Sequence, residues 1–98
     1  MVYEVVFTPA ALRQFKRLPA SARSLLKETI RERLGKQDPR EEDRNRFRLR
    51  RVSPYADFEL RVESWRVFYR VQGDLVIVEL IGRKIGNVLL IGGKEFKL

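Results

Sequence analysis

Three β-prone segments follow one another in the second half of the chain with almost no residues between them. Residues 57–62 and 65–71 are separated by two residues, and Gln72-Gly73-Asp74 leads into a third segment, residues 75–81. Neighbouring parallel strands need a crossover of about a dozen residues, so these short connections predict antiparallel pairing. The last segment is almost entirely apolar, which is typical of a central strand. We therefore expect a mostly antiparallel sheet.

The first half of the chain supplies a strand and two helices. Residues 2–7 are rich in valine and aromatic residues, as strands are. Thr8 then offers a capping hydroxyl, and Pro9 suits the first position of a helix that ends at Pro19. Apolar residues recur every four positions after Pro19 and predict a second helix that ends at Gly35. The two helices are expected to form a hairpin with a basic outer face.

The remaining segments complete the predicted fold. Residues 37–45 form a polar loop, the least regular stretch by composition, and residues 47–52 alternate arginine with apolar residues as a strand does. A turn at 53–56 follows, and after a basic turn at 82–87, residues 88–91 are predicted as an edge strand. Residues 1–98 are expected to form one α+β domain in the order β-α-α-β-β-β-β. The helix hairpin covers one face of a four-to-five-stranded sheet and leaves the other face open.

The chain has a large excess of positive charge, most of it from arginine. It carries 21 Lys and Arg against 13 Asp and Glu, a formal charge of +8. Arginine presents a planar fork of donors that fits phosphate oxygens, and it stays charged when partly desolvated. We therefore expect an anionic partner, nucleic acid first and an acidic protein second. The alternative is an ordinary solvated basic surface, or an ion-pair-rich surface like that of a thermophilic protein.

The composition also excludes several kinds of site. The chain contains no Cys and no His, which excludes disulfides, the usual zinc sites and nucleophiles that depend on histidine. No metal and no cofactor are expected. The first residues are too short and too acidic for a signal peptide, and no apolar run reaches membrane-spanning length, so a cytoplasmic protein is expected.

Strand alternation predicts that arginines gather on one face of the sheet. Side chains of one parity share a face, and the residues expected on the open face are Arg48, Arg50, Glu59, Arg61 and Arg66. Like charges on neighbouring strands repel, a cost that a fold bears more readily when an anion relieves it. The pattern favours a nucleic-acid site. The alternative is that acidic neighbours simply neutralise these arginines.

The pattern also predicts which other arginines and aromatic residues near this face are exposed and which are buried. Arg46 and Arg70 are expected to be solvated, and Tyr69 has the parity of the core valines. Phe68 has the parity of the arginines and is expected beside them. Tyr55, in a turn after a proline, is the aromatic residue most expected to be exposed, where it can stack on a base.

Three segments of the chain resemble toxins of the RelE/ParE family. They are residues 3–11 (Tyr-Glu-Val-Val-Phe-Thr-Pro-Ala-Ala), residues 18–23 (Leu-Pro-Ala-Ser-Ala-Arg) and the hairpin 58–71, which contains Trp-Arg-Val-Phe-Tyr-Arg-Val. Residues 75–84, a strand followed by Gly-Arg-Lys, are similar to a further segment of the family. The resemblance covers nearly the whole chain, and the order and spacing of the segments are more specific than any one motif.

The resemblance implies a toxin of a type II toxin–antitoxin system, with site residues carried over position by position. Arg66 matches the family's catalytic arginine, which contacts the scissile phosphate, and Arg61 matches a basic residue one strand earlier. Lys84, or its neighbour Arg83, matches the arginine after the central strand. RNA-binding roles are expected for Arg48, Arg50 and Arg83.

Two positions depart from the family pattern. Glu59 stands where the RelE prototype has a lysine, and Leu90 stands near the position of its C-terminal catalytic tyrosine. Glu59 can serve as a general base, or it can simply pair with Arg61. The resemblance therefore leaves open whether the chain is an enzyme.

The function that the resemblance implies is ribosome-dependent cleavage of mRNA by its own 2′-hydroxyl, which inhibits translation. The first alternative is a toxin that does not cleave RNA, either an inhibitor of DNA gyrase like the ParE branch or a ribosome binder. The second is an RNA-binding relative without toxicity. Under either toxin reading, a cognate antitoxin with an acidic, amphipathic segment is the expected partner. The ribosome and mRNA, or gyrase, are the expected targets.

Overall fold

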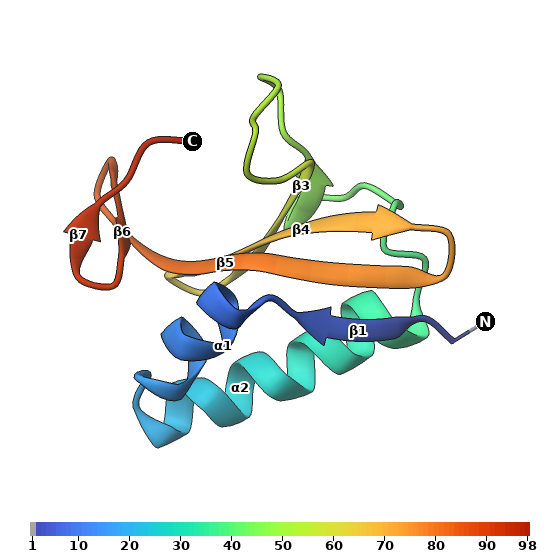
Figure 1. Ribbon diagram of the computed structural model, residues 1–98, viewed down its shortest axis with the longest axis horizontal. Coiled ribbons are helices and arrows are strands. Elements are labelled where there is room, and N and C mark those ends of the chain that lie inside the picture. The colour runs from blue at the N-terminus through green and yellow to red at the C-terminus, as the bar shows by residue number, and fades with distance from the viewer. Residues whose placement is uncertain (1) are drawn as a thin grey trace.

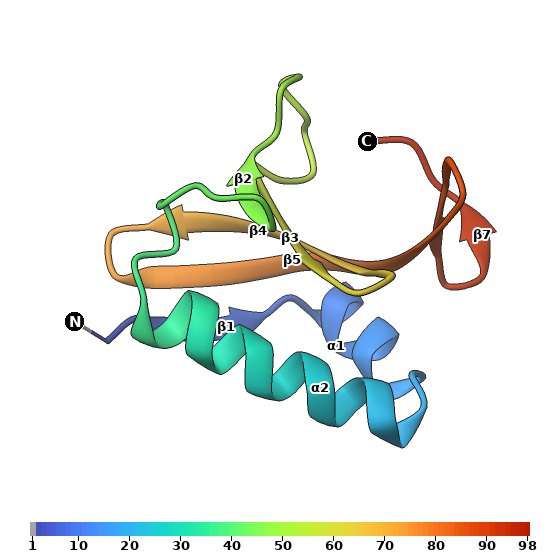
Figure 2. The same cartoon turned by 180° about the vertical axis from the view of Figure 1, so that it is seen from behind.

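The N-terminal strand β1 (Glu4–Phe7) passes directly into helix α1 (Pro9–Lys16) through a capping threonine. The hydroxyl of Thr8 accepts a hydrogen bond from the backbone N–H of Ala11 at 3.1 Å, as the sequence predicts. The computed structural model describes residues 2–98; Met1, the first residue of the predicted domain, lies outside the described residues. Figures 1 and 2 show the helices as one layer and the sheet as the other.

The second helix is longer than predicted and changes its geometry near its end. Helix α2 (Ala20–Ile30) continues without a break into a π-helical segment, η1 (Arg31–Lys36). The predicted end at Gly35 is therefore one residue early. Gly35 is buried, and its carbonyl accepts a hydrogen bond of 2.7 Å from the backbone N–H of Tyr3, which joins the helix end to the start of the chain.

Within residues 2–98 the sheet contains seven strands. After β1 come β2 (Arg46–Arg48), β3 (Phe58–Val62), β4 (Trp65–Gln72), β5 (Leu75–Ile85), β6 (Val88–Ile91) and β7 (Lys94–Glu95). Strands β2 to β7 lie in sequence order with antiparallel pairing, and β1 pairs in parallel with β5. The predicted α+β class and element order are confirmed, but among the described residues the sheet has seven strands and not the predicted four to five, with β7 as an addition. None of the helices in this part of the chain is long and apolar enough to cross a membrane.

Strand β5 is central, as its apolar sequence predicts. It pairs with β4 along one edge, and along the other edge it pairs first with β1 and then with β6. The hydrophobic core lies between the helices and one face of the sheet. Its fully buried members include Ala11, Leu26, Leu34, Leu60, Val67, Tyr69, Val76 and Val78. The opposite face of the sheet is free of helices (Figures 1 and 2).

Two segments rise above this open face and form its walls. One is the loop at residues 49–57, and the other is the C-terminal part of the chain from β6 onward (Figure 1). Gly82 in β5 permits the close approach of β6, because a Cβ there would lie 2.7 Å from the backbone oxygen of Leu90 and 2.9 Å from a side-chain carbon of Ile91. The predicted turn at 82–87 is thus mostly strand, and the chain reverses at Gly86-Asn87.

The prediction of a strand at residues 47–52 is wrong both in the length of the strand and in which side chains lie on each face of the sheet. Strand β2 ends at Arg48, and residues 49–57 form the loop. Arg46 and Arg48 pair with Leu60 and Phe58 of β3, whereas Phe47 pairs with Glu59. Phe47 therefore lies on the open face. Arg48 lies at the edge of the core face, with its guanidinium 4.5 Å from the ring centre of Phe58. The predicted parity places this strand one residue out of register.

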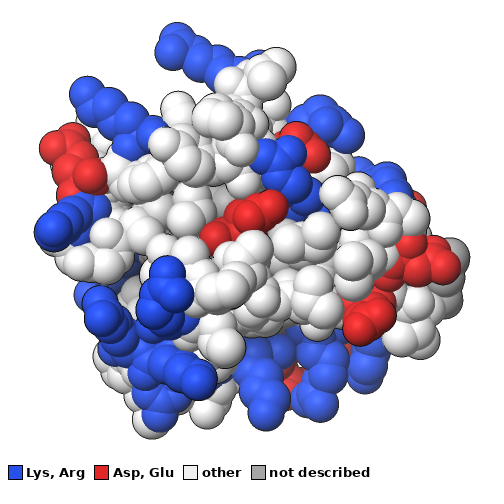
Figure 3. All heavy atoms as spheres, in the orientation of Figure 1, with Lys and Arg blue, Asp and Glu red and all other residues white. Residues whose placement is uncertain are grey.

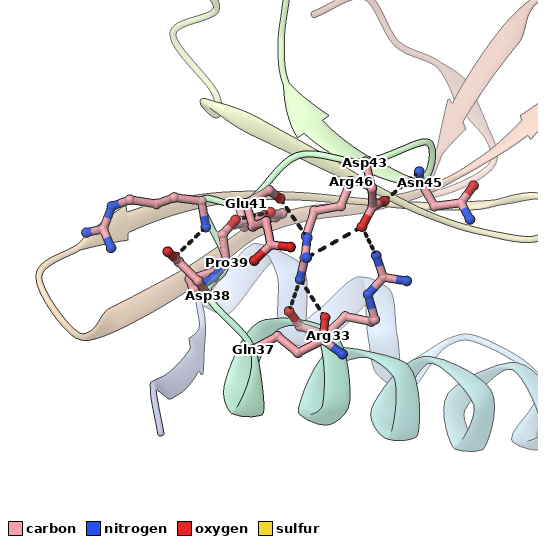
Figure 4. A network of polar contacts seen from close by, with 10 residues as sticks. Arg33, Gln37, Asp38, Pro39, Glu41, Asp43, Asn45 and Arg46 are labelled. Atoms are coloured by element: carbon pink, nitrogen blue, oxygen red, sulfur yellow. Dashed lines mark hydrogen bonds and ion pairs between the residues drawn. The ribbon is translucent and has the colours of Figure 1, made fainter. Parts of the chain in front are cut away.

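Arg46 is buried, which contradicts the prediction of a solvated side chain. It is 1% exposed, and its guanidinium donates to the carbonyls of Arg33 and Glu41, the second at 2.8 Å. It also donates to Gln37 Oε1 at 3.2 Å and lies 3.5 Å from Asp43 Oδ2 (Figure 4). This one side chain joins the helix end to the polar loop that composition predicts to be the least regular.

Asp43 and Tyr69 belong to the same network. Burial by itself raises the pKa of Asp43, but the backbone N–H of Asn45 and the guanidinium groups of Arg33 and Arg46 outweigh it, so the pKa lies below its ordinary value. Burial also raises the pKa of Tyr69, whose hydroxyl donates to the carbonyl of Pro39 at 2.7 Å. The polar loop is thus held to the core at several points.

Replacing Arg46 tests this network. Arg46→Ala is expected to lower the free energy of unfolding by about 3–5 kcal/mol, because it leaves buried acceptors without a donor and opens a cavity. Urea unfolding measures the effect. The control is Arg44→Ala, an exposed arginine two residues away, for which a change within about 0.5 kcal/mol is expected. Equal effects of the two substitutions would contradict a structural role for Arg46.

Candidate functional site

The β3–β4 hairpin brings the central charged residues of the open face together. In its register Arg61 pairs with Arg66 and Glu59 pairs with Phe68, so these four side chains share one face. Leu60 pairs with Val67, and both lie in the core on the other face. The predicted parity is therefore confirmed for this hairpin. Phe68 lies beside the arginines as predicted, although it is 1% exposed.

Glu59 forms the centre of this group. Its carboxylate oxygen Oε2 lies 2.8 Å from Nε of Arg61 and 3.6 Å from Nε of Arg66. Glu59 is buried, whereas Arg61 is exposed. One carboxylate therefore pairs with two arginines, so that the three side chains together carry a net positive charge at this point of the surface. That excess is what an anionic ligand needs.

Arg66 is held in position by its own hairpin. Its Nη1 donates to the carbonyl of Glu63 at 2.8 Å and to the carbonyl of Trp65 at 2.9 Å. Burial lowers the pKa of Arg66, repulsion from Arg61 lowers it further, and Glu59 opposes both effects. A partly buried guanidinium with a fixed orientation is preorganised to bind a phosphate oxygen.

Two hollows meet at Glu59. The first, here called the inner hollow, has a volume of about 190 Å³ and lies over β4, β5 and β6. Its lining residues are Glu59, Arg66, Phe68, Lys84, Leu89, Phe96 and Leu98. Lys84 is placed here because β5 continues as a strand beyond the predicted turn. The inner hollow thus has a charged floor and apolar walls.

The second hollow, here called the outer hollow, is larger and more polar. It has a volume of about 720 Å³ and lies along β2, β3 and the base of the protruding loop. Its basic lining residues are Arg44, Arg48, Arg50 and Arg61, and its acidic ones are Glu42, Asp43 and Glu59. The predicted residues Arg48, Arg50 and Arg61 therefore share one hollow, which adjoins that of Arg66 and Lys84 at Glu59. The loop, and not a strand, positions Arg50.

Arg83 does not join this group. It pairs with Trp65 across β4 and β5, and its guanidinium lies 5.1 Å from the ring centre of that tryptophan. Arg83 lines a different cavity of about 540 Å³, here called the arginine cleft, between α1 and the β5–β6 hairpin. Leu90, at the position expected for the family's tyrosine, lines the same cleft. The structure therefore separates both residues from Arg66.

The prediction that Arg70 is solvated is also wrong. Its guanidinium donates to the carbonyl of Pro54 at 2.6 Å, and it lies 3.1 Å from a carboxylate oxygen of Glu79 and 3.4 Å from one of Asp57. A register shift between Phe68 and Tyr69 leaves Glu79 without a partner on β4, which accommodates this contact. Arg70 therefore anchors the protruding loop to the sheet.

Aromatic residues near the site come from two distant segments. Tyr55 in the protruding loop is 44% exposed, as predicted, and its ring centre lies 5.0 Å from that of Phe96 in an edge-to-face arrangement. Sequence reasoning missed Phe96 and Leu98 because the C-terminal residues carry no periodic pattern. The one available signal was Gly92-Gly93, a pair that permits a tight reversal of the chain.

The basic surface extends beyond the open face. Figure 3 shows lysine and arginine side chains along the lower edge of the molecule, over the helices, and also at the top, on the protruding loop. Arg13 and Arg17 of the helix layer line the arginine cleft together with Arg83. The chain therefore offers two separate basic concavities, one on each side of the sheet.

Comparisons with known proteins agree with this fold. A solved structure, the toxin–antitoxin complex RelBE2 from Mycobacterium tuberculosis, contains a similar chain with a TM-score of 0.71 and 23% sequence identity; the match covers 86% of this chain and 100% of that one. At that identity the likeness shows the fold. A search of the curated proteins found no match. A sequence model described as the ParE toxin of the type II toxin–antitoxin system parDE matches residues 5–84. The chain thus belongs to the ParE toxin family and is the toxin of a type II toxin–antitoxin system.

Proposed function

We propose that this toxin cleaves mRNA on the ribosome. The observation that carries the proposal is the position of Glu59, a buried carboxylate between Arg61 and Arg66 at the junction of two basic hollows. A carboxylate can accept a proton from a 2′-hydroxyl, and guanidinium groups stabilise the charge that develops on phosphorus. Both groups are needed for RNA cleavage by internal attack.

The reaction follows from these groups. Glu59 accepts the proton of the 2′-hydroxyl, and the 2′-oxygen forms a bond to the adjacent phosphorus while the bond to the 5′-oxygen breaks. Arg61 and Arg66 neutralise the phosphorane, and Lys84, which lines the same hollow as Arg66, donates a proton to the departing oxygen. The products are a 2′,3′-cyclic phosphate and a 5′-hydroxyl end.

The outer hollow is the proposed path of the RNA backbone. Arg44 and Arg50 line it along the approach to Glu59, where each can neutralise a phosphate, whereas the guanidinium of Arg48 lies over Phe58. The ribosome supplies the position of the mRNA, so a modest set of catalytic groups suffices. Arg83, on the far side of the sheet, has no part in this path.

Loss of the central groups is expected to abolish cleavage. Arg66→Ala and Glu59→Gln are each expected to reduce cutting of mRNA in a translating extract by about a hundredfold or more, because each removes charge stabilisation or the base. Mapping of mRNA ends, with detection of the cyclic phosphate, measures the effect. The control is Arg17→Ala in the arginine cleft, with cutting expected to stay unchanged. Full activity of Arg66→Ala would contradict the mechanism.

A second candidate is inhibition of DNA gyrase without RNA cleavage. Two observations favour it. The matching family model is described as the ParE toxin. In addition, position 90 holds a leucine that lines the arginine cleft, so it supplies no catalytic tyrosine beside Arg66. Pulse labelling after induction separates the two. Under the proposed function, incorporation of amino acids is expected to stop before incorporation of thymidine. The reverse order would favour gyrase.

The arginine cleft is the proposed docking site for the antitoxin. Its floor is aliphatic, with Leu18, Ile81 and Leu90, and its basic residues are Arg13, Arg17 and Arg83. Among residues 2–98, the cleft lining contains no acidic side chain. These features fit an amphipathic segment with apolar anchors and carboxylates.

Reversal of charge in the arginine cleft is expected to weaken the antitoxin complex. The double substitution of Arg13→Glu with Arg17→Glu should raise the dissociation constant about tenfold or more, because it replaces attraction with repulsion. Calorimetric titration with the purified antitoxin measures the effect. Arg51→Glu, an exposed site in the protruding loop, is the control. Unchanged affinity of the double variant would rule out this docking site.

A further inference from the structure

The inner hollow is covered by the C-terminal end of the chain. Phe96 and Leu98 form part of its wall, opposite the charged residues Glu59, Arg66 and Lys84. The volume of about 190 Å³ is below the roughly 300–1,000 Å³ that is usual for ligand pockets. In the conformation of the structure, the space beside Arg66 is therefore smaller than a usual ligand pocket.

The covering segment is held by few contacts. Strand β7 contains two residues, Lys94 and Glu95, which pair with Ile91 and Leu90 of β6. Beyond β7, the backbone N–H of Phe96 donates to the carbonyl of Leu89 at 2.9 Å. Short terminal strands of this kind exchange between bound and released states with little cost in free energy.

A further contact joins the C-terminal segment to the protruding loop. The ring centres of Phe96 and Tyr55 are 5.0 Å apart at an interplanar angle of 70°, so an aromatic contact fastens the C-terminal segment, which lines the inner hollow, to the protruding loop. The loop side of this contact is firmly attached. The guanidinium of Arg70 donates a hydrogen bond to the carbonyl of Pro54, and the backbone N–H of Tyr55 donates to Ser53 Oγ at 3.1 Å. If the Tyr55–Phe96 contact breaks, we therefore expect the C-terminal segment to move and the loop to stay in place.

The turn before β7 supplies a point of flexion. Gly92 and Gly93 both have positive φ angles, 61° and 79°, in the region that glycine adopts without strain. Each has open space around its Cα, since a Cβ there would meet no atom within 4 Å. Residues 94–98 can thus move about this pair with loss of the β6–β7 pairing, while β6 keeps its pairing with β5.

We propose that residues 94–98 are an autoinhibitory strap, fastened by the Tyr55–Phe96 contact, that must leave the inner hollow before RNA reaches Arg66. The proposal rests on the proposed function for its substrate, single-stranded RNA. It concerns the regulation of the same site. In the closed state Phe96 and Leu98 narrow the space beside Arg66 and Lys84, and in the open state that space is wide enough to admit RNA from the outer hollow. RNA binding and closure of the strap are then mutually exclusive.

Substitution of either aromatic residue tests the strap. Phe96→Ala and Tyr55→Ala remove the same contact from opposite sides, and each is expected to tighten binding of a fluorescent single-stranded RNA oligonucleotide by about threefold to tenfold, because a larger fraction of molecules is open. Fluorescence anisotropy measures the binding. Val52→Ala, exposed in the same loop, and Val88→Ala, exposed in β6, are the controls. Their affinities are expected to equal that of the unmodified protein.

Hydrogen exchange supplies a readout that needs no RNA. In Tyr55→Ala the amide of residue 96, which donates to Leu89 in the closed state, is expected to exchange about threefold to tenfold faster, while the amides of β4 are unchanged. Slower or equal exchange, or weaker RNA binding in both variants, would overturn the strap; weaker binding would instead make the aromatic pair a surface on which bases stack.

A third variant separates this proposal from the proposed function. Adding Arg66→Ala to Phe96→Ala is expected to remove the gain in RNA affinity, because the gain comes from exposure of that arginine. If the gain and the faster exchange occur but no mRNA is cut, the strap stands and the cleavage mechanism fails. If mRNA is cut while the aromatic variants neither tighten binding nor speed exchange, the strap fails and the cleavage mechanism stands.

Discussion

The register of the β3–β4 hairpin is the constraint on which the rest of the molecule depends. Because side chains alternate between the two faces of a strand, one register places Leu60 and Val67 in the core and Glu59 and Arg66 on the open face. A slip of one residue would exchange the two sets. The cost of burying unpaired arginines excludes that slip. The same alternation that builds the core therefore also builds the charged surface.

Two arginines of the same sheet, one on each side of β3, show that the surroundings determine the role of a side chain. Arg46 is surrounded by carbonyl and carboxylate acceptors and holds the polar loop to the helix end. Arg66 shares one carboxylate with Arg61 and lines the inner hollow. A guanidinium whose acceptors are all supplied by the fold contributes to stability. One that is only partly satisfied retains capacity for a ligand.

Much of the fold followed from local patterns, and the errors have identifiable causes. Thr8 and Pro9 predict the start of α1, and the apolar run from Leu75 predicts the central strand, since caps and buried strands leave signals in contiguous residues. The prediction failed at residues 49–52, where alternation typical of a strand lies in a loop. That loop is held by Arg70, far along the chain. Alternation alone does not identify a strand's partner.

Within the candidate site, the sequence by itself determined which chemical groups are present: many arginines, one carboxylate at position 59, and neither histidine nor cysteine. It also determined that Arg61 and Arg66 share a face, because a two-residue turn leaves little freedom of register. Only the tertiary structure decided that Arg83 lies on the other side of the sheet and that Phe96 meets Tyr55. The first placement follows from the register of β5 against β4, and the second from the close approach of β6 to β5 at Gly82. Contacts between distant segments arise from packing in three dimensions, which no local pattern of residues encodes.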